Sequence, residues 1–299
     1  MAKKKMFFLY NPHAGKSQIK SKLADIINVF MRADYEIQVY ATQKPEEAID
    51  AVRQYAGGVD CLVVSGGDGT LNEAICGLMQ LPREQRPVVG YLPAGTTNDF
   101  AYTHRLSKDM VAAAETVVNG VREVVDLGLF EDRYFTYVAG FGAFTDVPYK
   151  TPQEMKAILG HPAYLLEGML SLGDLRPHTL RIELENDTLE GEFLLGLISN
   201  SERVAGFKGL HGKDVSINDG LLEVLLIRNP KNPADLSQTL TGLLQPDSQS
   251  PMVYRAKTRR IRLISEAALD WVLDGEFGGR KSEVTIEAVP SAVEILKNL

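Results

Sequence analysis

Glycine-rich turns hold the residues of this chain whose types and spacing could do chemistry. The strongest covers residues 65–73, Ser-Gly-Gly-Asp-Gly-Thr-Leu-Asn-Glu, where an apolar run gives way to a helical pattern. Successive glycines let backbone N–H groups approach a ligand closely, and a helix N-terminus attracts an anion. The turn therefore indicates a phosphate-binding loop, with a tight turn that holds no ligand as the alternative. It is not the dinucleotide fingerprint, because Asn72 stands at the third glycine position.

Asp68 needs a cation beside it if this loop binds a phosphate. A carboxylate about 4 Å from a phosphate oxygen is repelled by about 4 kcal/mol at an effective dielectric of about 20. Mg²⁺ removes this repulsion, since it is commonly held by one or two carboxylates together with substrate phosphates and water. We therefore interpret Asp68 as a ligand of a Mg²⁺–nucleotide, directly or through water.

Two further turns also contain glycine together with polar residues. Residues 11–17, NPHAGKS, and residues 93–100, PAGTTNDF, also follow apolar runs. The first looks like half of a Walker A loop, but Tyr10 stands where that motif requires glycine, so a P-loop NTPase is disfavoured. It predicts a second phosphate contact with Lys16 as a donor, or else a helix cap with a solvated lysine. The second offers hydroxyl and amide groups to a ligand, or is a capped loop.

The segments between these turns predict a parallel sheet. Through residue 125, apolar runs alternate with helix-period patterns, which is typical of a parallel sheet covered on both faces. The apolar runs are 5–10, 36–42, 59–67 and 87–95, and the helical patterns are 17–33, 45–57, 70–81 and 108–120. Ligands bind at the carboxyl ends of the strands of such a sheet, so we expect the three turns to converge at one edge.

The pattern changes after residue 126 to short β-rich segments separated by turn residues, which predict antiparallel strands. These segments are 124–131, 133–141, 179–186, 189–200, 221–228, 259–265, 269–277 and 282–289, with helical interruptions at 152–172 and 233–244. We therefore predict an α/β domain at 1–125 and a larger β domain at 126–287. Residues 288–299 are expected to return to the first domain.

Two acidic turns lie in the second half, at residues 218–220, Asn-Asp-Gly, and at residues 273–279, Leu-Asp-Gly-Glu-Phe-Gly-Gly. Each is interpreted first as a hairpin turn whose acidic side chain is solvated. The alternative concerns Glu276, which could take a proton from an attacking hydroxyl group if it faced a nucleotide across a cleft.

Composition excludes several classes of function. The chain has 299 residues, 44% of them hydrophobic, and 32 basic against 39 acidic residues give a net charge of −7. These values are typical of a globular protein and argue against a nucleic-acid coat. The sequence contains no apolar run of membrane-spanning length and no signal peptide, so we predict a cytosolic protein. Cys61 and Cys76 have neither disulfide nor zinc spacing.

Five motifs together resemble the diacylglycerol kinase catalytic family, and in particular its soluble bacterial members of the diacylglycerol kinase B type. They are NPHAGK, SGGDGTLNEA, LPAGTTNDFA, NDGLLEV and LDGE, in the family's order and spacing over nearly the whole chain. GGDGT by itself is shared with NAD kinases and phosphofructokinases. The resemblance implies an α/β nucleotide-binding domain of the NAD kinase/phosphofructokinase type and a larger antiparallel β-sandwich domain that binds the lipid.

The resemblance also implies a reaction and its residues. ATP would give its γ-phosphoryl group to the hydroxyl of diacylglycerol in a cleft between the two domains, yielding phosphatidic acid. Asp68 would act on the catalytic Mg²⁺ through water, and Glu276 would be the general base. A structural Mg²⁺ would be held by Ser216, Asp219 and Leu221. The nucleotide contacts carried over by motif are Asn11, Pro12, His13, Ala14, Gly15, Thr42, Gly67, Asp68, Gly69, Thr70, Leu71, Asn72, Glu73 and Thr96.

A membrane lipid as substrate implies peripheral contact with the anionic inner face of the cell membrane, and homodimers occur in this family. Basic residues near such a surface contribute about 1 kcal/mol each, although solvated faces are the alternative. The candidates are Lys3, Lys4, Lys5, Lys16, Lys20, Lys22, Lys257, Arg259, Arg260 and Arg262.

The identity of the lipid stays open, because residues 201–208 depart from the glycine run that many relatives carry near Gly206. Undecaprenol, ceramide or a sphingoid base are alternative acceptors. NAD kinase and a non-catalytic nucleotide- or lipid-binding regulator are alternative functions.

Overall fold

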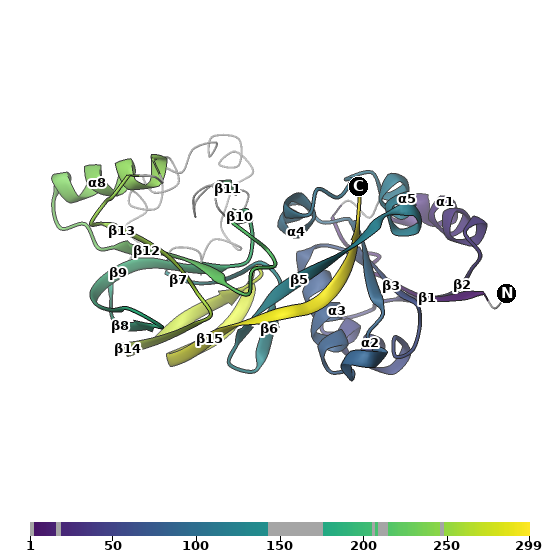
Figure 1. The fold of residues 1–299 in the computed structure, drawn as a ribbon, viewed down its shortest axis with the longest axis horizontal. Coiled ribbons are helices and arrows are strands. Elements are labelled where there is room, and N and C mark those ends of the chain that lie inside the picture. The colour runs from purple at the N-terminus through teal and green to yellow at the C-terminus, as the bar shows by residue number, and fades with distance from the viewer. Residues whose placement is uncertain (1–2, 16–18, 143–175, 205–206, 209–214, 246–247) are drawn as a thin grey trace. The chain divides into compact units, whose positions relative to one another are not determined.

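The computed structural model describes residues 3–15, 19–142, 176–204, 207–208, 215–245 and 248–299. The chain divides into two compact units, of which unit 1 comprises Met1–Leu127 with Pro290–Leu299 and unit 2 comprises Gly128–Val289 (Figure 1). The division predicted from sequence lay at residues 125/126 and 287/288. The helix predicted at 152–172 and the side chain of Lys16 lie outside the described residues.

Unit 1 contains a parallel sheet. Its strands run in the order β15-β4-β3-β1-β2, and every pair is parallel. The strands are β1 (Lys4–Tyr10), β2 (Tyr35–Ala41), β3 (Cys61–Gly66), β4 (Val88–Pro93) and the end of β15 (Glu276–Lys297). β3 and β4 are buried along their whole length, which explains why they are continuous apolar runs. Ile295 near the chain end pairs with Val89 of β4.

Helices cover both faces of this sheet, α1 and α5 on one side and α2 and α3 on the other (Figure 1). They are α1 (Ile19–Arg32), α2 (Glu47–Tyr55), α3 (Asp68–Met79), α4 (Asp99–Thr103) and α5 (Met110–Asn119), with a short 3-10 turn η1 (Arg83–Gln85). α1 buries Ile19, Ile26, Val29 and Phe30, whose spacing places them on one helix face. The sequence did not predict α4, because five residues are too few for a periodic pattern.

Unit 2 is built from antiparallel strands in the order β13-β12-β9-β7-β14-β15, and β8 pairs with both β9 and β14. Its elements are β6 (Arg133–Phe135), β7 (Val138–Gly142), β8 (His178–Leu184), β9 (Thr188–Ser199), β10 (Arg203–Val204), β11 (Phe207–Lys208), β12 (Leu222–Arg228), α8 (Pro233–Leu244), β13 (Val253–Thr258) and β14 (Arg260–Leu273). The chain passes between the units within β5 (Val121–Phe130) and within β15. Sequence analysis missed β13, whose charged residues interrupt the apolar alternation.

The core of unit 2 lies on both sides of β12. Leu222, Val224 and Leu226 belong to one apolar cluster, while Leu225 and Ile227 belong to another. This alternation follows from the two-residue period of a strand, so both faces of β12 are buried. In the first cluster the ring of Trp271 lies 5.0 Å from that of Phe130 and 5.2 Å from that of Phe141. The second cluster is covered by α8 through Leu243.

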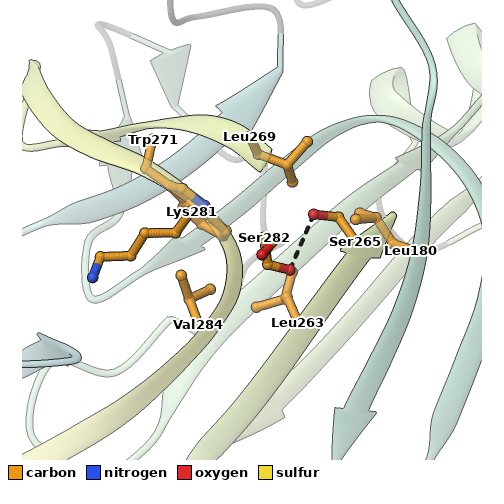
Figure 2. A pocket seen from close by; sticks show the side chains of 8 residues that line it. All are labelled: Leu180, Leu263, Ser265, Leu269, Trp271, Lys281, Ser282 and Val284. Atoms are coloured by element: carbon orange, nitrogen blue, oxygen red, sulfur yellow. Dashed lines mark hydrogen bonds between the residues drawn. The ribbon is translucent and has the colours of Figure 1, made fainter. Parts of the chain in front are cut away.

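A small pocket opens beside Trp271, where the register of β14 against β15 shifts between Ile264 and Leu269 (Figure 2). Ser265 closes part of it by donating to the main-chain oxygen of Ser282 at 3.1 Å. The pocket is lined by Leu180, Leu263, Ser265, Leu269, Trp271, Lys281, Ser282 and Val284. It has no room for a water molecule, so we interpret it as imperfect packing at the bulge rather than as a ligand site.

Glu123 of β5 joins three segments of unit 1. Its carboxylate lies 3.1 Å from His104 Nδ1 at the end of α4 and also accepts from Lys297 Nζ near the chain end. The hydrogen bond from His104, followed by that from Lys297, lowers the pKa of Glu123 to about 2. Since His104 is buried and its ring lies 4.2 Å from that of Phe100, this contact fixes the position of α4.

Glu123→Gln should lower the stability of the fold in a pH-dependent way. The pKa of Glu123 is lower in the folded chain, so its contribution is present above pH 4.5 and is lost as the pH falls toward 2. Because solvent screens this partly exposed group, we expect about 1 kcal/mol at pH 7. Thermal unfolding from pH 7 to pH 3 measures it. The control is Glu294→Gln, which removes an exposed partner of Arg122 and should have little effect on stability. A loss of stability in Glu123→Gln that does not change with pH would contradict the assignment.

Candidate active site

Four strands of unit 1 end at the same edge of the parallel sheet. The register pairs Tyr10 with both Ala41 and Ser65, and it pairs Gly66 with Pro93. The turns that follow β1, β2, β3 and β4 therefore start at the same height along the strand direction. The carboxyl edge is where ligands bind in sheets of this kind.

Hydrogen bonds join the turns that follow these strands. The backbone N–H of Asn11 donates to Ser65 O at 2.8 Å, and that of Ala94 donates to Gly66 O at 2.7 Å. The Asn11 side chain also donates from Nδ2 to Thr70 Oγ1 at 3.3 Å. The structure thus brings the three glycine-containing turns together.

Glycine is required where the turns touch. Gly15 has φ of +52°, and a Cβ atom there would lie 2.1 Å from Ala94 O. A Cβ on Gly95 would lie 2.7 Å from the Cα of Gly67. Real Cβ atoms do not make such contacts, so a larger residue would push the turns apart. The absent side chains leave main-chain groups exposed at close range, as phosphate binding needs.

The N-terminus of α3 lies at this edge. Gly67 precedes the helix in an extended conformation and contributes no side-chain cap, so the first N–H groups of α3 receive no capping bond from it. Helix N-termini of this kind bind anions through these groups and through the helix dipole. Residues 69–73 form the first turns of α3, and Glu73 additionally accepts from the N–H of Glu46 at 3.0 Å.

Asp68 is oriented by the first turn of α4. Its Oδ2 accepts from the N–H of Asp99 at 3.1 Å and its Oδ1 accepts from the N–H of Phe100 at 3.4 Å. Burial, and secondarily the negative charge of Asp68, raises the pKa of the neighbouring Tyr91. The fully buried Asp99 was missed by sequence analysis, because the short helix that carries it gives no pattern.

We call the three glycine-containing turns and the N-terminus of α3 the cradle. The other residues predicted to contact the nucleotide lie around it. Asn11 accepts from the N–H of His13 at 2.9 Å, which shapes the turn containing Pro12, Ala14 and Gly15. Thr42 is buried, and its N–H donates to Tyr10 O at 3.0 Å.

The turn that carries Thr96 is closed by Asn98. The Asn98 side chain both accepts from the N–H of Gly95 at 2.9 Å and donates to Gly95 O at 2.8 Å. Thr96 itself is exposed at the tip of this turn. Its hydroxyl is therefore accessible to a ligand.

The acidic turn at Asp219 belongs to unit 2. Asp219 Oδ1 accepts from the N–H of Leu221 at 3.1 Å, and Oδ2 lies 3.0 Å from Lys257 Nζ. The same ammonium lies 3.5 Å from Oε1 of Glu223, a buried side chain whose pKa burial raises to about 7. Ser216 donates its N–H to this Oε1 at 3.4 Å.

The charges at this turn suit a cation. Two carboxylates face one ammonium, and Oε2 of Glu223 is buried with no hydrogen-bond partner among the described residues. Within the described ranges no three His, Cys, Asp or Glu side chains gather to bind a metal, so an ion here would use main-chain carbonyl oxygens as well. Sequence analysis missed Glu223, and it named Lys257 only as a candidate membrane contact. A single glutamate inside the apolar run 221–228 was the available signal for Glu223.

The last acidic turn connects β14 to β15. Glu276 begins β15 and is exposed, so its carboxylate is available to a substrate. Asp274 was expected to be solvated on this turn, but the structure corrects this prediction because only 4% of the residue is exposed. Its carboxylate is bound by main-chain N–H groups of residues 136–138.

Two family models match successive parts of the chain. Residues 5–130 match the diacylglycerol kinase catalytic domain, and residues 139–297 match the YegS C-terminal NAD kinase beta sandwich-like domain. The predicted fold class, an α/β nucleotide-binding domain with an antiparallel β-sandwich, is thereby confirmed. No helix in the described part of the chain is both long and apolar enough to span a membrane.

Similar proteins agree with these matches. The chain is 35% identical to a diacylglycerol kinase of Bacillus subtilis over 92% of this chain and 91% of that protein. It is 34% identical to a diacylglycerol kinase of Staphylococcus aureus, over 93% and 88% respectively. A crystal structure described as a diacylglycerol kinase from Bacillus anthracis has the same fold, with a TM-score of 0.78 and 21% identity over 100% of this chain and 98% of that one.

One assignment follows from the turns that suit phosphate binding, from the hydrogen-bonded Asp68 and from similarity over nearly the whole chain. The chain belongs to the diacylglycerol kinase family and is a lipid kinase.

Proposed function

We propose that this protein transfers the γ-phosphoryl group of ATP to the hydroxyl of diacylglycerol in the presence of Mg²⁺, giving phosphatidic acid. The observation that carries the proposal is the cradle of three glycine-containing turns around the oriented carboxylate of Asp68. Its chemistry suits a polyphosphate and a cation together. The acceptor is proposed from the relatives, which are named diacylglycerol kinase.

The cradle would bind the nucleotide through main-chain N–H groups. Residues 11–15 and residues 67–73 line the carboxyl edge of the sheet, with Thr42 and Thr96 at the neighbouring turns. Phosphoryl transfer demands positioning and charge stabilisation more than covalent help from the protein. The rigid contact among the turns serves this need, because it fixes the donors before ATP binds.

Asp68 would hold Mg²⁺, directly or through a water molecule, and a bound Mg²⁺ supplies positive charge that neutralises the phosphates. The two N–H groups of α4 limit the directions available to this carboxylate. These two bonds therefore hold the Asp68 carboxylate in one orientation.

Glu276 is proposed to accept the proton of the lipid hydroxyl as the oxygen attacks the γ-phosphorus. Its carboxylate is exposed on the turn before β15 and is therefore accessible to an acceptor. A carboxylate within hydrogen-bond reach of the attacking hydroxyl is the usual requirement for such a base.

Ser216, Asp219 and Leu221 are proposed to hold a second, structural Mg²⁺. The Asp219 carboxylate supplies negative charge at this turn, and Oε2 of Glu223, which has no hydrogen-bond partner among the described residues, is a further oxygen beside it. Lys257 competes for the same charge, since its ammonium lies against both carboxylates.

Peripheral membrane contact at the inner face of the cell membrane is part of the proposal. Two basic clusters are candidates, residues 3–22 as the first and residues 257–262 as the second. The second supports contact weakly, because Arg260 pairs with Glu287 and Arg262 pairs with Glu283 and Glu183. The exposed lysines of the first cluster are the better candidates. They are Lys3, Lys4, Lys5, Lys20 and Lys22.

The decisive experiment compares acceptors. We expect release of ADP from Mg·ATP with diacylglycerol in mixed micelles, and much slower release with NAD, undecaprenol, ceramide or a sphingoid base. Glu276→Gln should bind ATP normally and release almost no ADP, because the hydroxyl proton then has no acceptor. Faster ADP release with another acceptor would identify that acceptor, instead of diacylglycerol, as the substrate. No ADP release with any acceptor would favour a binding protein.

Asp68→Asn should lower kcat by about 100-fold or more, because the neutral amide holds a divalent cation poorly. Steady-state kinetics at several Mg²⁺ concentrations measure the loss and its partial recovery at high Mg²⁺. The matched control is Asp50→Asn, which removes an exposed carboxylate of α2 and should leave kcat unchanged. Full Mg²⁺-dependent turnover in Asp68→Asn would refute the assigned role.

Mg²⁺ should raise the Tm of the nucleotide-free protein through the Asp219 turn. A ligand at 100 times its Kd stabilises the fold by about 2.7 kcal/mol. We expect Asp219→Asn to reduce this increase in Tm and Lys257→Met to enlarge it, since the competing ammonium is removed. Asp270→Asn, an exposed carboxylate on β14, serves as the control. An equal response of Tm to Mg²⁺ in wild type and Asp219→Asn would exclude an ion at this turn.

A further inference from the structure

Asp274 is a buried carboxylate to which the proposed reaction gives no role. It lies on the turn between β14 and β15, two residues before Glu276, and only 4% of it is exposed. Acidic residues on turns are normally solvated. Burying a carboxylate is unfavourable unless hydrogen bonds replace its lost water.

Four hydrogen bonds replace that water. Oδ2 of Asp274 accepts from the N–H of Thr136 at 2.6 Å and from its Oγ1 at 2.7 Å. Oδ1 accepts from the N–H of Tyr137 at 2.9 Å and from that of Val138 at 3.0 Å. Three consecutive main-chain donors, from the end of β6 to the first residue of β7, thus bind both oxygens of one carboxylate. Bonds of this charge-assisted kind are short and strong.

The main chain of Asp274 is tied to the same segment. Its N–H donates to Val138 O at 2.9 Å. The side chain and the backbone of this one residue therefore bind residues 136–138 from two directions. The turn cannot move relative to that segment without breaking several bonds at once.

The turn itself is a tight hairpin loop. Asp274 has φ of +50° and Gly275 has φ of +87°, so both central residues are in the left-handed region. This suits a two-residue hairpin loop, which the pairing of Leu273 with Glu276 closes. Asp-Gly is a preferred pair for such a loop, because aspartate enters the left-handed region more readily than most residues with a side chain. The bonds to residues 136–138 then fix where this loop lies.

We propose that Asp274 is a positioning residue for Glu276: its buried carboxylate holds the hairpin turn against residues 136–138 and so fixes the backbone from which the base projects. The inference rests on the proposed function, because it assigns a partner to Glu276. Asp274 acts through the turn and takes no proton itself. Its buried carboxylate is bound by the N–H and hydroxyl donors of residues 136–138.

Asparagine cannot take over this role. A carboxylate accepts at both oxygens, whereas the amide of asparagine accepts at one and donates at the other. In Asp274→Asn, the NH₂ group would face either the donors of Thr136 or those of Tyr137 and Val138. Part of the anchor is therefore lost without a change of side-chain size.

The test is a double-mutant cycle with Asp274→Asn, Glu276→Gln and the double variant, measured as diacylglycerol-dependent ADP release. We expect Asp274→Asn to lower kcat by about 10- to 100-fold with the KM for ATP unchanged, because only the orientation of the base is affected. In the Glu276→Gln background the same substitution should leave the small residual rate of ADP release unchanged, since the group that it positions is already absent.

Thr136→Val keeps the test decisive if Asp274→Asn does not fold. It removes one of the four bonds to the carboxylate and leaves the main-chain donors in place. We expect a several-fold lower kcat, which again disappears in the Glu276→Gln background. Hydrogen exchange supplies a readout independent of activity, in which the amides of residues 136–138 should exchange faster in both variants than in the wild type.

Two results would overturn the inference. One is an equal loss of kcat from Asp274→Asn in the presence and absence of Glu276, which would make Asp274 a structural residue only. The other is unchanged amide exchange at residues 136–138, which would show that Asp274 does not hold the turn. Failure of the proposed function can be distinguished from both results, because the wild type would then release no ADP with diacylglycerol. The amide exchange measurement would still decide whether Asp274 anchors the turn.

Discussion

Close contact between backbone turns at the carboxyl edge of one parallel sheet is the constraint on which the candidate nucleotide site depends. Gly67 and Gly95 approach so closely that a Cβ atom on Gly95 would collide with the other residue, and Gly15 meets Ala94 O in the same way. The common register of the strands brings these turns to one level. Without both conditions, the N–H groups of the three turns would not face a single ligand.

Main-chain N–H groups orient an acidic side chain in each unit. Asp68 is held by the N–H groups of Asp99 and Phe100, and Asp274 is held by those of residues 136–138. Main-chain donors hold a carboxylate more rigidly than long side chains do, since they lose little conformational freedom on binding. The exposures differ, however. Asp274 is buried, which suits an anchor, whereas the neighbouring Glu276 is exposed, which suits a group that meets substrate.

Ion pairs involve several of the basic residues that the sequence offered as membrane contacts. Lys257 lies against Asp219 and Glu223, and Arg262 is paired across neighbouring strands. The net charge of −7 contains no information about this distribution. The partners come from segments distant in sequence, so the spacing of the basic residues could not reveal them.

The sequence by itself determined the fold class, most strands and the family, because apolar periodicity and motif order are local properties of the chain. It also located Asp68 and the glycine turns, since a strand-to-helix turn has a recognisable composition. Only the tertiary structure decided that α4 orients Asp68, that Lys257 lies between Asp219 and Glu223 and that Asp274 is buried rather than solvated. Each depends on a partner dozens of residues away or on a helix too short for a pattern. Burial and hydrogen bonding between distant segments exist only once the chain has folded.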